Sequence, residues 1–186
     1  MRTRFFILFF VSILSTLQSF SQPKLVKGLY IKGGAKFEKV SWGDKKLTLP
    51  IVEIGKQWNK RLLTSLNYSA GSAGDMSHYY IDTKCADANV FYSALVIGCN
   101  ALRIGTGISY RHNEANALVS SRRDADGNIT ETEYRFETLS KLGLNIMIED
   151  EVNIYKGIIL SGRVGYQAYG RPMRSYMAAL QLGYRF

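Results

Sequence analysis

Apolar and polar residues alternate one by one over long stretches of this chain. The pattern is clearest at the C-terminus, where every second residue is apolar: Tyr176, Ala178, Leu180, Leu182, Tyr184 and Phe186. The residues between them, such as Gln181 and Arg185, are smaller or more polar. Successive side chains of a strand point to opposite faces, so the pattern predicts strands with one apolar face. No stretch after residue 21 has a sustained apolar pattern at helical spacing.

Related alternation, weaker in places, recurs along the chain and predicts eight strands. Their expected ranges are 28–37, 48–58, 61–70, 89–99, 102–112, 136–148, 156–168 and 175–186. Most have about ten residues, the length that a tilted strand needs to cross a bilayer, whereas strands of soluble proteins average about five or six. The segment 89–99 is apolar on both faces, so its register is left open.

Short and long connections alternate between these segments. The short ones are Asn59-Lys60, Asn100-Ala101 and the acidic stretch 149–153. The other four connections are 38–47, 71–88, 113–135 and 169–174. Transmembrane barrels have short periplasmic turns and longer external loops. We therefore expect an all-β fold, an eight-stranded antiparallel up-and-down transmembrane barrel with its long loops outside.

The two parities of each strand predict which side chains face lipid and which face the lumen. The residues expected to face lipid are Leu102, Ile104, Ile108, Leu142, Leu144, Ile146, Leu160, Val164, Leu180 and Leu182. Aromatic girdles are expected from Phe37, Tyr68, Tyr110 and Tyr166 at the outer ends of strands and from Trp58 and Tyr184 at inner ends. The expected lumen residues are Glu53, Arg61, Arg103, Lys141, Arg163 and Arg185. We expect these charges to fill the lumen by pairing, with a narrow anion-preferring path as the alternative.

The N-terminus has the three parts of a secretory signal. Arg2 and Arg4 precede an apolar run over 5–17, which is followed by the small-x-small site 19–21. The run is too short and too interrupted for a spanning helix, which needs about 20 apolar residues. We expect residues 1–21 to be a cleaved signal peptide and 22–186 to be a single barrel domain.

The chain is basic, with a formal net charge of +9 that becomes +7 when Arg2 and Arg4 leave with the signal peptide. An exported protein rarely meets nucleic acid, so none is expected as a partner. Anionic lipid head groups or polyanionic glycans fit this charge better.

Two sequence features raise the question of a bound calcium ion and of a disulfide bond. Asp124-Ala125-Asp126-Gly127-Asn128-Ile129 with Glu133 resembles part of a calcium loop, but Arg122 occupies the first ligand position, so a hairpin tip is expected. Cys85 is expected in an external loop and Cys99 near the periplasmic end of a strand. At about 3.3 Å per residue they would be too far apart to bond, so two free thiols are expected.

The two histidines give weak catalytic or metal signals. His112, with Ser109 and Ser120 nearby in sequence, is the only candidate for a catalytic base, and an exposed loop position is expected for it. His78 with Asp75 and Asp82 could bind a metal, but their spacing fits no rigid element. No catalytic residue, metal or cofactor is therefore expected.

The C-terminal Leu180-x-Leu182-x-Tyr184-x-Phe186 resembles the end signature of outer-membrane barrels. The resemblance is to small eight-stranded barrels of Gram-negative cell envelopes, of the OmpA/OmpX or porin-like type. It implies an outer-membrane location and recognition of Leu182, Tyr184 and Phe186 by the barrel-assembly machinery. These families share an architecture rather than a site, so no functional residue carries over.

The expected function is that of a non-enzymatic outer-membrane barrel in contact with outer-membrane lipid. It would be structural, or would present loops 71–88 and 113–135 to an extracellular polymer or protein. Three alternatives stay open: a lipid-modifying barrel enzyme using His112, a soluble lipocalin-like barrel with its apolar parity inward, and a subunit of a larger secretion or transfer apparatus.

Overall fold

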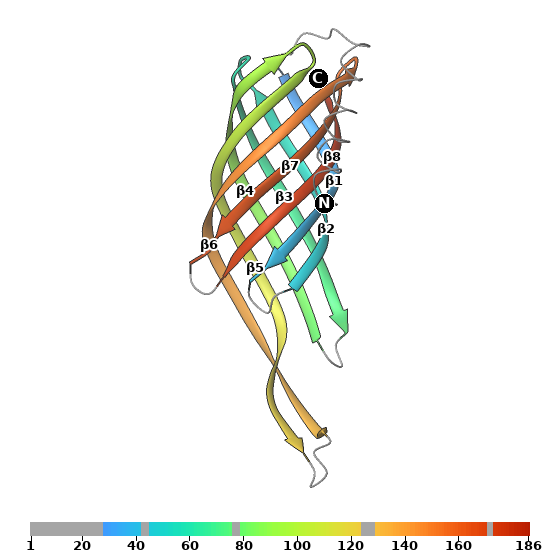
Figure 1. Cartoon of the computed structure of the whole chain (residues 1–186), viewed down its shortest axis with the longest axis vertical. Coiled ribbons are helices and arrows are strands. Elements are labelled where there is room, and N and C mark those ends of the chain that lie inside the picture. Colours follow the sequence, from blue (N-terminus) through green and yellow to red (C-terminus); the bar gives the residue numbers. More distant parts are fainter. Residues whose placement is uncertain (1–27, 42–44, 76–78, 124–128, 171–172) are drawn as a thin grey trace, which may run out of the picture.

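The protein is a closed barrel of eight antiparallel strands, seen in a computed structural model that describes residues 28–41, 45–75, 79–123, 129–170 and 173–186 (Figure 1). Each strand pairs with its neighbours in sequence, as an up-and-down barrel requires. The strands are β1 (Gly28–Val40), β2 (Lys45–Gln57), β3 (Leu62–Asp75), β4 (Tyr79–Ile97), β5 (Asn100–Arg123), β6 (Ile129–Tyr155), β7 (Ile158–Ala168) and β8 (Arg174–Arg185).

Pairing of the first strand with the last closes the sheet. β1 and β8 are antiparallel partners from Tyr30↔Arg185 to Val40↔Ser175. At the last residue, Phe186 N donates to Leu29 O at 2.9 Å. The end of the barrel where β1 begins and β8 ends is called the terminal end, and the opposite end the hairpin end. The expected eight-stranded antiparallel barrel is confirmed.

Side chains alternate across the barrel wall with the expected parity. Ile104 is 52% exposed on the outside, whereas its neighbour Arg103 is fully buried inside. Nine of the ten residues predicted to face lipid are exposed, and Leu160 is half-buried with the same outward parity. The apolar parity therefore faces out, and the lipocalin-like alternative, which needs it inside, is wrong.

The bulge in β4 answers the open question of register in 89–99. Asn89, Phe91 and Ser93 point inward, while Val90 and Tyr92 point out. The register then shifts between Ser93 and Leu95, so that the odd-numbered Leu95 and Ile97 take the outward parity that even-numbered residues have before the shift. One inserted residue accounts for apolar residues at both parities.

Two of the three short turns lie elsewhere than predicted. The β4–β5 turn is Gly98-Cys99 rather than Asn100-Ala101. The β6–β7 turn is Lys156-Gly157, both at positive φ (39° and 91°), instead of the acidic stretch 149–153. Residues 149–153 continue β6, because their alternate acidic side chains point into the barrel and find basic partners there.

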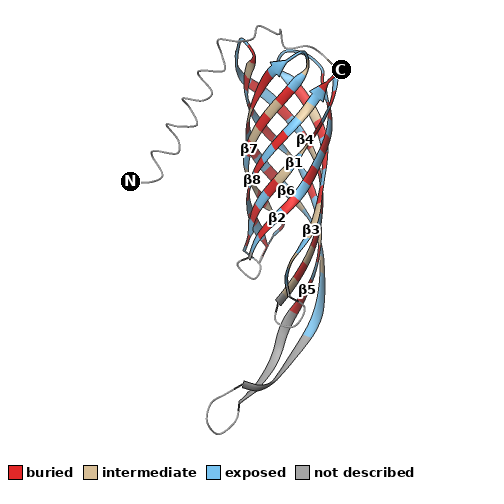
Figure 2. Ribbon diagram, turned by 90° about the vertical axis from the view of Figure 1, so that its right-hand side faces the viewer, coloured by how far each residue is buried: buried red, intermediate tan, exposed pale blue. Residues whose placement is uncertain are grey.

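The predicted long loops 71–88 and 113–135 are mostly strand. β3 and β4 continue to Asp75↔Tyr79, and β5 and β6 pair out to Arg123↔Ile129. The β5–β6 hairpin projects far beyond the rest of the barrel at the hairpin end (Figures 1 and 2). In the sequence of these segments alternate apolar residues occur only in short runs, so period-two hydropathy did not reveal them as strands.

The predicted aromatic girdle residues all point outward, but not all lie at strand ends. Tyr68 and Tyr110 lie well inside β3 and β5, because those strands extend past the positions predicted for their ends. Tyr166 is half-buried against Tyr176, with ring centroids 5.2 Å apart.

Some sequence-based expectations fall outside the described residues. These are the signal peptide 1–21, His78, and the segment 124–128 that carries the calcium-like motif. Within the described ranges, no helix has the length and apolar character needed to cross a membrane.

Ile146 tests whether the outward parity contacts lipid. It is 58% exposed and pairs with Thr106, near the middle of the outward apolar rows. An arginine at mid-bilayer costs about 2–4 kcal/mol and one near the interface about 0–1 kcal/mol. We expect Ile146→Arg to lower the free energy of unfolding by about 2–4 kcal/mol, measured by urea titration in phospholipid vesicles with tryptophan fluorescence.

Phe136→Arg is the matched control, because Phe136 is an exposed apolar residue of β6 beyond the end of its pairing with β7. Its expected loss is less than about 1 kcal/mol. Equal losses for the two variants would contradict a lipid-facing Ile146.

Candidate functional site

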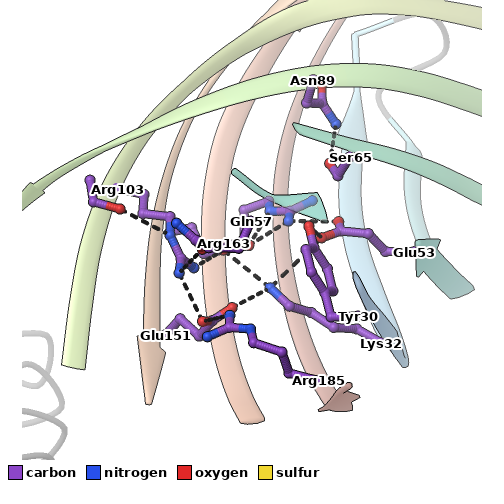
Figure 3. Close-up of polar contacts among 12 residues, drawn as sticks. Tyr30, Lys32, Glu53, Gln57, Ser65, Asn89, Arg103, Glu151, Arg163 and Arg185 are labelled. Atoms are coloured by element: carbon purple, nitrogen blue, oxygen red, sulfur yellow. Dashed lines mark hydrogen bonds and ion pairs between the residues drawn. The ribbon is translucent and has the colours of Figure 1, made fainter. Parts of the chain in front are cut away.

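The interior of the barrel near the terminal end holds a network of seven charged side chains from six strands (Figure 3). We call it the terminal-end network. Its members are Lys32, Glu53, Arg103, Glu149, Glu151, Arg163 and Arg185. All are at most 4% exposed, and the alternation of the strands brings all of them to one side of the wall.

Arg103 joins the two acidic residues of β6. Its Nη1 donates to Glu149 Oε1 at 2.9 Å and its Nη2 to Glu151 Oε1 at 2.8 Å. The same guanidinium reaches Gln57 Oε1 at 3.2 Å and Ser93 Oγ at 3.3 Å. A planar guanidinium with five N–H groups suits this role, because it can donate to both carboxylates, Gln57 and Ser93 at once, whereas a lysine has only three N–H groups.

Arg163 and Lys32 link the same carboxylates to β2. Arg163 Nη2 lies 2.6 Å from Glu53 Oε2, and its Nε donates to Glu149 Oε2 at 3.0 Å. Lys32 Nζ lies 3.1 Å from Glu149 Oε1 and 2.9 Å from Glu151 Oε2. Tyr30 donates from its hydroxyl to Glu53 at 2.9 Å. Each buried carboxylate therefore has more than one donor, as removal of a charge from water requires.

A second polar cluster, the hairpin-end network, occupies the other half of the interior. Its members are Lys36, Glu38, Asp87, Ser109, Arg111, Gln167 and Ser175. Glu38 accepts hydrogen bonds from Arg111 and Ser175, and Lys36 Nζ lies 3.4 Å from it. Asp87 accepts from Ser109, and from Gln167 Nε2 at 3.2 Å.

Apolar side chains close the interior at the hairpin end. Val40, Leu47, Leu49, Ile81, Ala115, Tyr169 and Met173 form a buried cluster there. Tyr169 joins this cluster to the hairpin-end network, because its hydroxyl lies 2.6 Å from Ser109 Oγ. Burial raises the pKa of this phenol, so the hydroxyl stays neutral. Paired charges therefore occupy the interior, and an apolar layer separates them from the hairpin end.

The structure places the six predicted lumen residues in different surroundings. Glu53, Arg103, Arg163 and Arg185 lie in the terminal-end network. The prediction for Arg61 is wrong: it lies in the turn before β3, is exposed, and donates to the Tyr92 hydroxyl at 2.5 Å. Lys141 is only half-buried, beyond the last β6–β7 pair at Leu144↔Ala168.

Sequence reasoning missed Glu149 and Glu151, the central acids of the network. A signal was present, because both continue the parity of Asn145 and Met147 opposite the outward Ile146 and Ile148. The density of acidic residues there favoured a turn over a strand, although alternate acids on one face are compatible with a polar lumen.

The two cysteines are free and buried, as the sequence analysis expected for their bonding state. The placement of Cys85 in an external loop is wrong. It lies in β4 and points into the hairpin-end network, where its Sγ contacts Asp87 Oδ1 at 3.3 Å. In the described ranges, no group of three residues is arranged to hold a metal ion. Asp82 instead lies 3.6 Å from Lys84, and the side chains of Asp75 and His78 are outside the described set.

His112 lies on the outer face of β5, in a cluster that the sequence did not reveal. Its Nδ1 lies 2.7 Å from Ser140 Oγ and its Nε2 lies 3.2 Å from Glu114 Oε1. Neither predicted serine takes part: Ser109 points into the barrel, and the side chain of Ser120 is outside the described set. Ser140 is 28 residues away in sequence and meets His112 only through the β5–β6 register.

Comparison with known structures finds other small barrels. The chain is similar to Neisserial surface protein A, with a TM-score of 0.66 and 14% identity over 86% of this chain and 97% of that one. It is also similar to a major outer membrane protein of Thermus thermophilus, with a TM-score of 0.64 and 12% identity over 87% and 100%. No protein-family model matches the sequence, and no curated protein matches it in sequence.

A third similar structure is Ail, the attachment invasion locus protein of Yersinia pestis, in complex with the heparin analogue sucrose octasulfate. The TM-score is 0.60 and the identity 13%, over 87% of this chain and 100% of that one. Identities this low show a shared fold only. The chain therefore has the fold of the small eight-stranded outer-membrane barrels.

Glu149 is the residue on which the terminal-end network should depend most. Glu149→Gln would leave Lys32, Arg103 and Arg163 short of one negative charge in a buried site. Removing one partner of a buried ion pair costs about 3–5 kcal/mol. We expect a loss of that size in the free energy of unfolding, measured by urea titration of the protein in lipid vesicles.

Glu137→Gln is the control, because it makes the same chemical change at an exposed position of β6. Its expected effect is within about 0.5 kcal/mol. A loss below about 1 kcal/mol for Glu149→Gln, the range of exposed pairs, would show that the network contributes little to stability.

Proposed function

We propose that this chain is an outer-membrane protein that passes no solutes and acts through the surface it presents at its hairpin end. The observation that carries the proposal is the filled interior of a barrel whose outer wall is apolar. The two interior networks and the apolar cluster Val40, Leu47, Leu49, Ile81, Ala115, Tyr169 and Met173 leave the outside surfaces as the place of function.

The alternative of an anion-preferring path is disfavoured by the pairing of the interior bases. An anion path would need basic groups without a carboxylate partner. Arg103 and Arg163 each contact two carboxylates, and Arg111 is paired with Glu38. Eight-stranded barrels have an interior just wide enough to be filled by side chains, which fits the same conclusion.

The β5–β6 hairpin is the main element available for contact with a partner. β4 accompanies β5 only as far as Ala115, and β7 accompanies β6 only as far as Leu144. Beyond these points, in the described residues, the hairpin is a two-stranded ribbon standing clear of the barrel (Figure 1). A rigid scaffold with a projecting element is a common arrangement for recognition. Its partner would be a protein or surface polymer, and the role needs neither chemistry nor a cofactor.

Two further contacts belong to the proposal. The outward belt of apolar residues, which includes Ile104, Leu144 and Leu182, would face outer-membrane lipid. In a soluble protein an apolar surface of this size would be exposed to water, which is rare. Leu182, Tyr184 and Phe186 also point outward, so the last strand offers the side chains that the barrel-assembly machinery would read.

Thiol labelling tests the location and orientation. The native Cys85 and Cys99 are buried, so an introduced exposed cysteine should react alone. Glu137 lies in the β5–β6 hairpin and Lys60 in the β2–β3 turn, and both are exposed. We expect a membrane-impermeant maleimide to label Glu137→Cys on intact cells, and Lys60→Cys only after the outer membrane is permeabilised. The reverse pattern would overturn the orientation, and labelling of neither would overturn the location.

Recordings in planar lipid bilayers test the closed interior. Because paired charges occupy both halves of the barrel, we expect the purified protein to give no stable conductance steps in salt solution. A heat-dependent shift in gel mobility would show that the inserted protein is folded. Steady ion-selective conductance from protein in that folded form would show that the networks leave an open path.

A further inference from the structure

The polar cluster around His112 lies on the outer wall of the barrel and has no part in the function proposed above. Three outward side chains stand in register across neighbouring strands: Lys84 on β4, His112 on β5 and Ser140 on β6. The next outward row toward the hairpin end is Asp82, Glu114 and Thr138. Strand pairing alone thus brings a hydroxyl, an imidazole, a carboxylate and an ammonium group to one patch.

The contacts within this patch join a serine, a histidine and a carboxylate in series. His112 Nδ1 is 2.7 Å from Ser140 Oγ, and His112 Nε2 is 3.2 Å from Glu114 Oε1. Ser140 is directly across from His112, and Glu114 is two residues along the same strand face. A base within hydrogen-bond reach of a serine, and itself held by a carboxylate, is the arrangement that activates a serine nucleophile.

The depth of the patch indicates the substrate class. On β5 the outward residues from Leu102 to Tyr110 are apolar except for Thr106, and they would span about 20 Å of membrane height at 3.3 Å per residue and a tilt near 40°. Toward the hairpin end, His112 is the next outward-facing residue of β5 after Tyr110, and Ser140 is the next outward-facing residue of β6 after Leu142. That step adds roughly 5 Å, which puts Ser140 where hydrocarbon gives way to head groups. The ester bonds of membrane lipids lie at this boundary.

The surroundings of Ser140 suit an acylated anionic lipid. The exposed Tyr110, Leu142 and Leu144 form an apolar track that leads from the patch down the wall. Lys84, half-exposed and 3.6 Å from Asp82, places a positive charge on the β4 side of His112, where an anionic head group would lie. β7 pairs with β6 only up to Leu144, so in the described residues no strand covers the side of β6 next to Ser140.

We propose that Ser140, His112 and Glu114 form a serine esterase site for the ester-linked acyl chains of the surrounding membrane lipid. Ser140 and His112 are the catalytic residues and Glu114 is a positioning residue. This activity goes beyond the proposed function and shares with it only the membrane location and orientation.

The reaction follows from the contacts. Ser140 Oγ attacks the acyl carbonyl carbon while its proton passes to His112. The carbon–oxygen bond to the lipid alcohol then breaks, and His112 returns the proton to that alcohol. Water next attacks the acyl-serine, giving one proton to His112, and the fatty acid leaves as Ser140 Oγ regains the proton. One ester and one water become one acid and one alcohol.

The experiment uses the full mature chain folded in vesicles of phosphatidylglycerol and phosphatidylcholine. Released fatty acid is measured by mass spectrometry, and an alkyl fluorophosphonate probe reports a reactive serine. We expect fatty-acid release above protein-free vesicles and a phosphonate adduct on Ser140. Ser140→Ala and His112→Asn should each lower release by about 100-fold or more.

Ser72→Ala is the matched control, an exposed strand serine on β3, opposite Asp82 and away from His112. It should leave release unchanged. Glu114→Gln should slow phosphonate labelling of Ser140, and Glu114→Asp should restore part of the rate, which a merely structural carboxylate would not do. Heat-dependent gel mobility verifies that every variant is folded.

Two outcomes would overturn the esterase site: no fatty acid and no Ser140 adduct from the folded protein, or release that persists in Ser140→Ala. Neither outcome affects the thiol-labelling or conductance results. A failure of the esterase site is therefore distinguishable from a failure of the proposed function.

Discussion

Closure of the sheet by β1 and β8 is the constraint on which the rest of this structure depends. A strand inside lipid has no water to satisfy its backbone, so an open edge in the membrane-spanning region would cost several kcal/mol for each unpaired group. The pairing from Tyr30↔Arg185 to Val40↔Ser175 removes that edge. Once the ring is closed, alternation leaves one parity of side chains outside and the other in a space about as wide as the side chains themselves. The charged interior follows from this geometry, because a polar parity enclosed in so narrow a space has to find its partners within the protein.

The parts of the fold with one apolar face were predictable from the sequence. The alternation from Leu102 to Tyr110 identified both the strand and its orientation, and the shift at Ser93 explains why the segment 89–99 gave no single register. Outside the apolar belt the same method had no signal. The sequence of the β5–β6 hairpin has no long run of alternate apolar residues, so it was predicted as a loop. The acidic stretch 149–153 was predicted as a turn because local composition does not show that Arg103 and Arg163 lie across the lumen.

For the candidate sites too, the sequence predicted what depends on one strand and missed what depends on how two strands pair. Arg103, Arg163, Arg185 and Glu53 were placed in the interior from parity alone, since parity needs only the residue's own strand. The contact between His112 and Ser140 needs the pairing of two strands over 28 residues, and no spacing rule in one sequence supplies that. Arg61 failed for a related reason. Parity carries no information outside a strand, and β3 begins only at Leu62, one residue after Arg61.

If the protein occupies the outer membrane as proposed, the long-range pairing of Glu149 has a consequence for how the polypeptide would enter the bilayer. Its partners lie 117 residues earlier at Lys32, 46 residues earlier at Arg103 and 14 residues later at Arg163. A strand inserted by itself would carry its uncompensated charge across hydrocarbon, where charged side chains are costly. Stepwise entry of hairpins is therefore opposed until β1, β5, β6 and β7 have gathered. For that location, the energetics would favour a pathway in which a nearly complete cylinder assembles at the membrane surface and crosses as one cooperative unit.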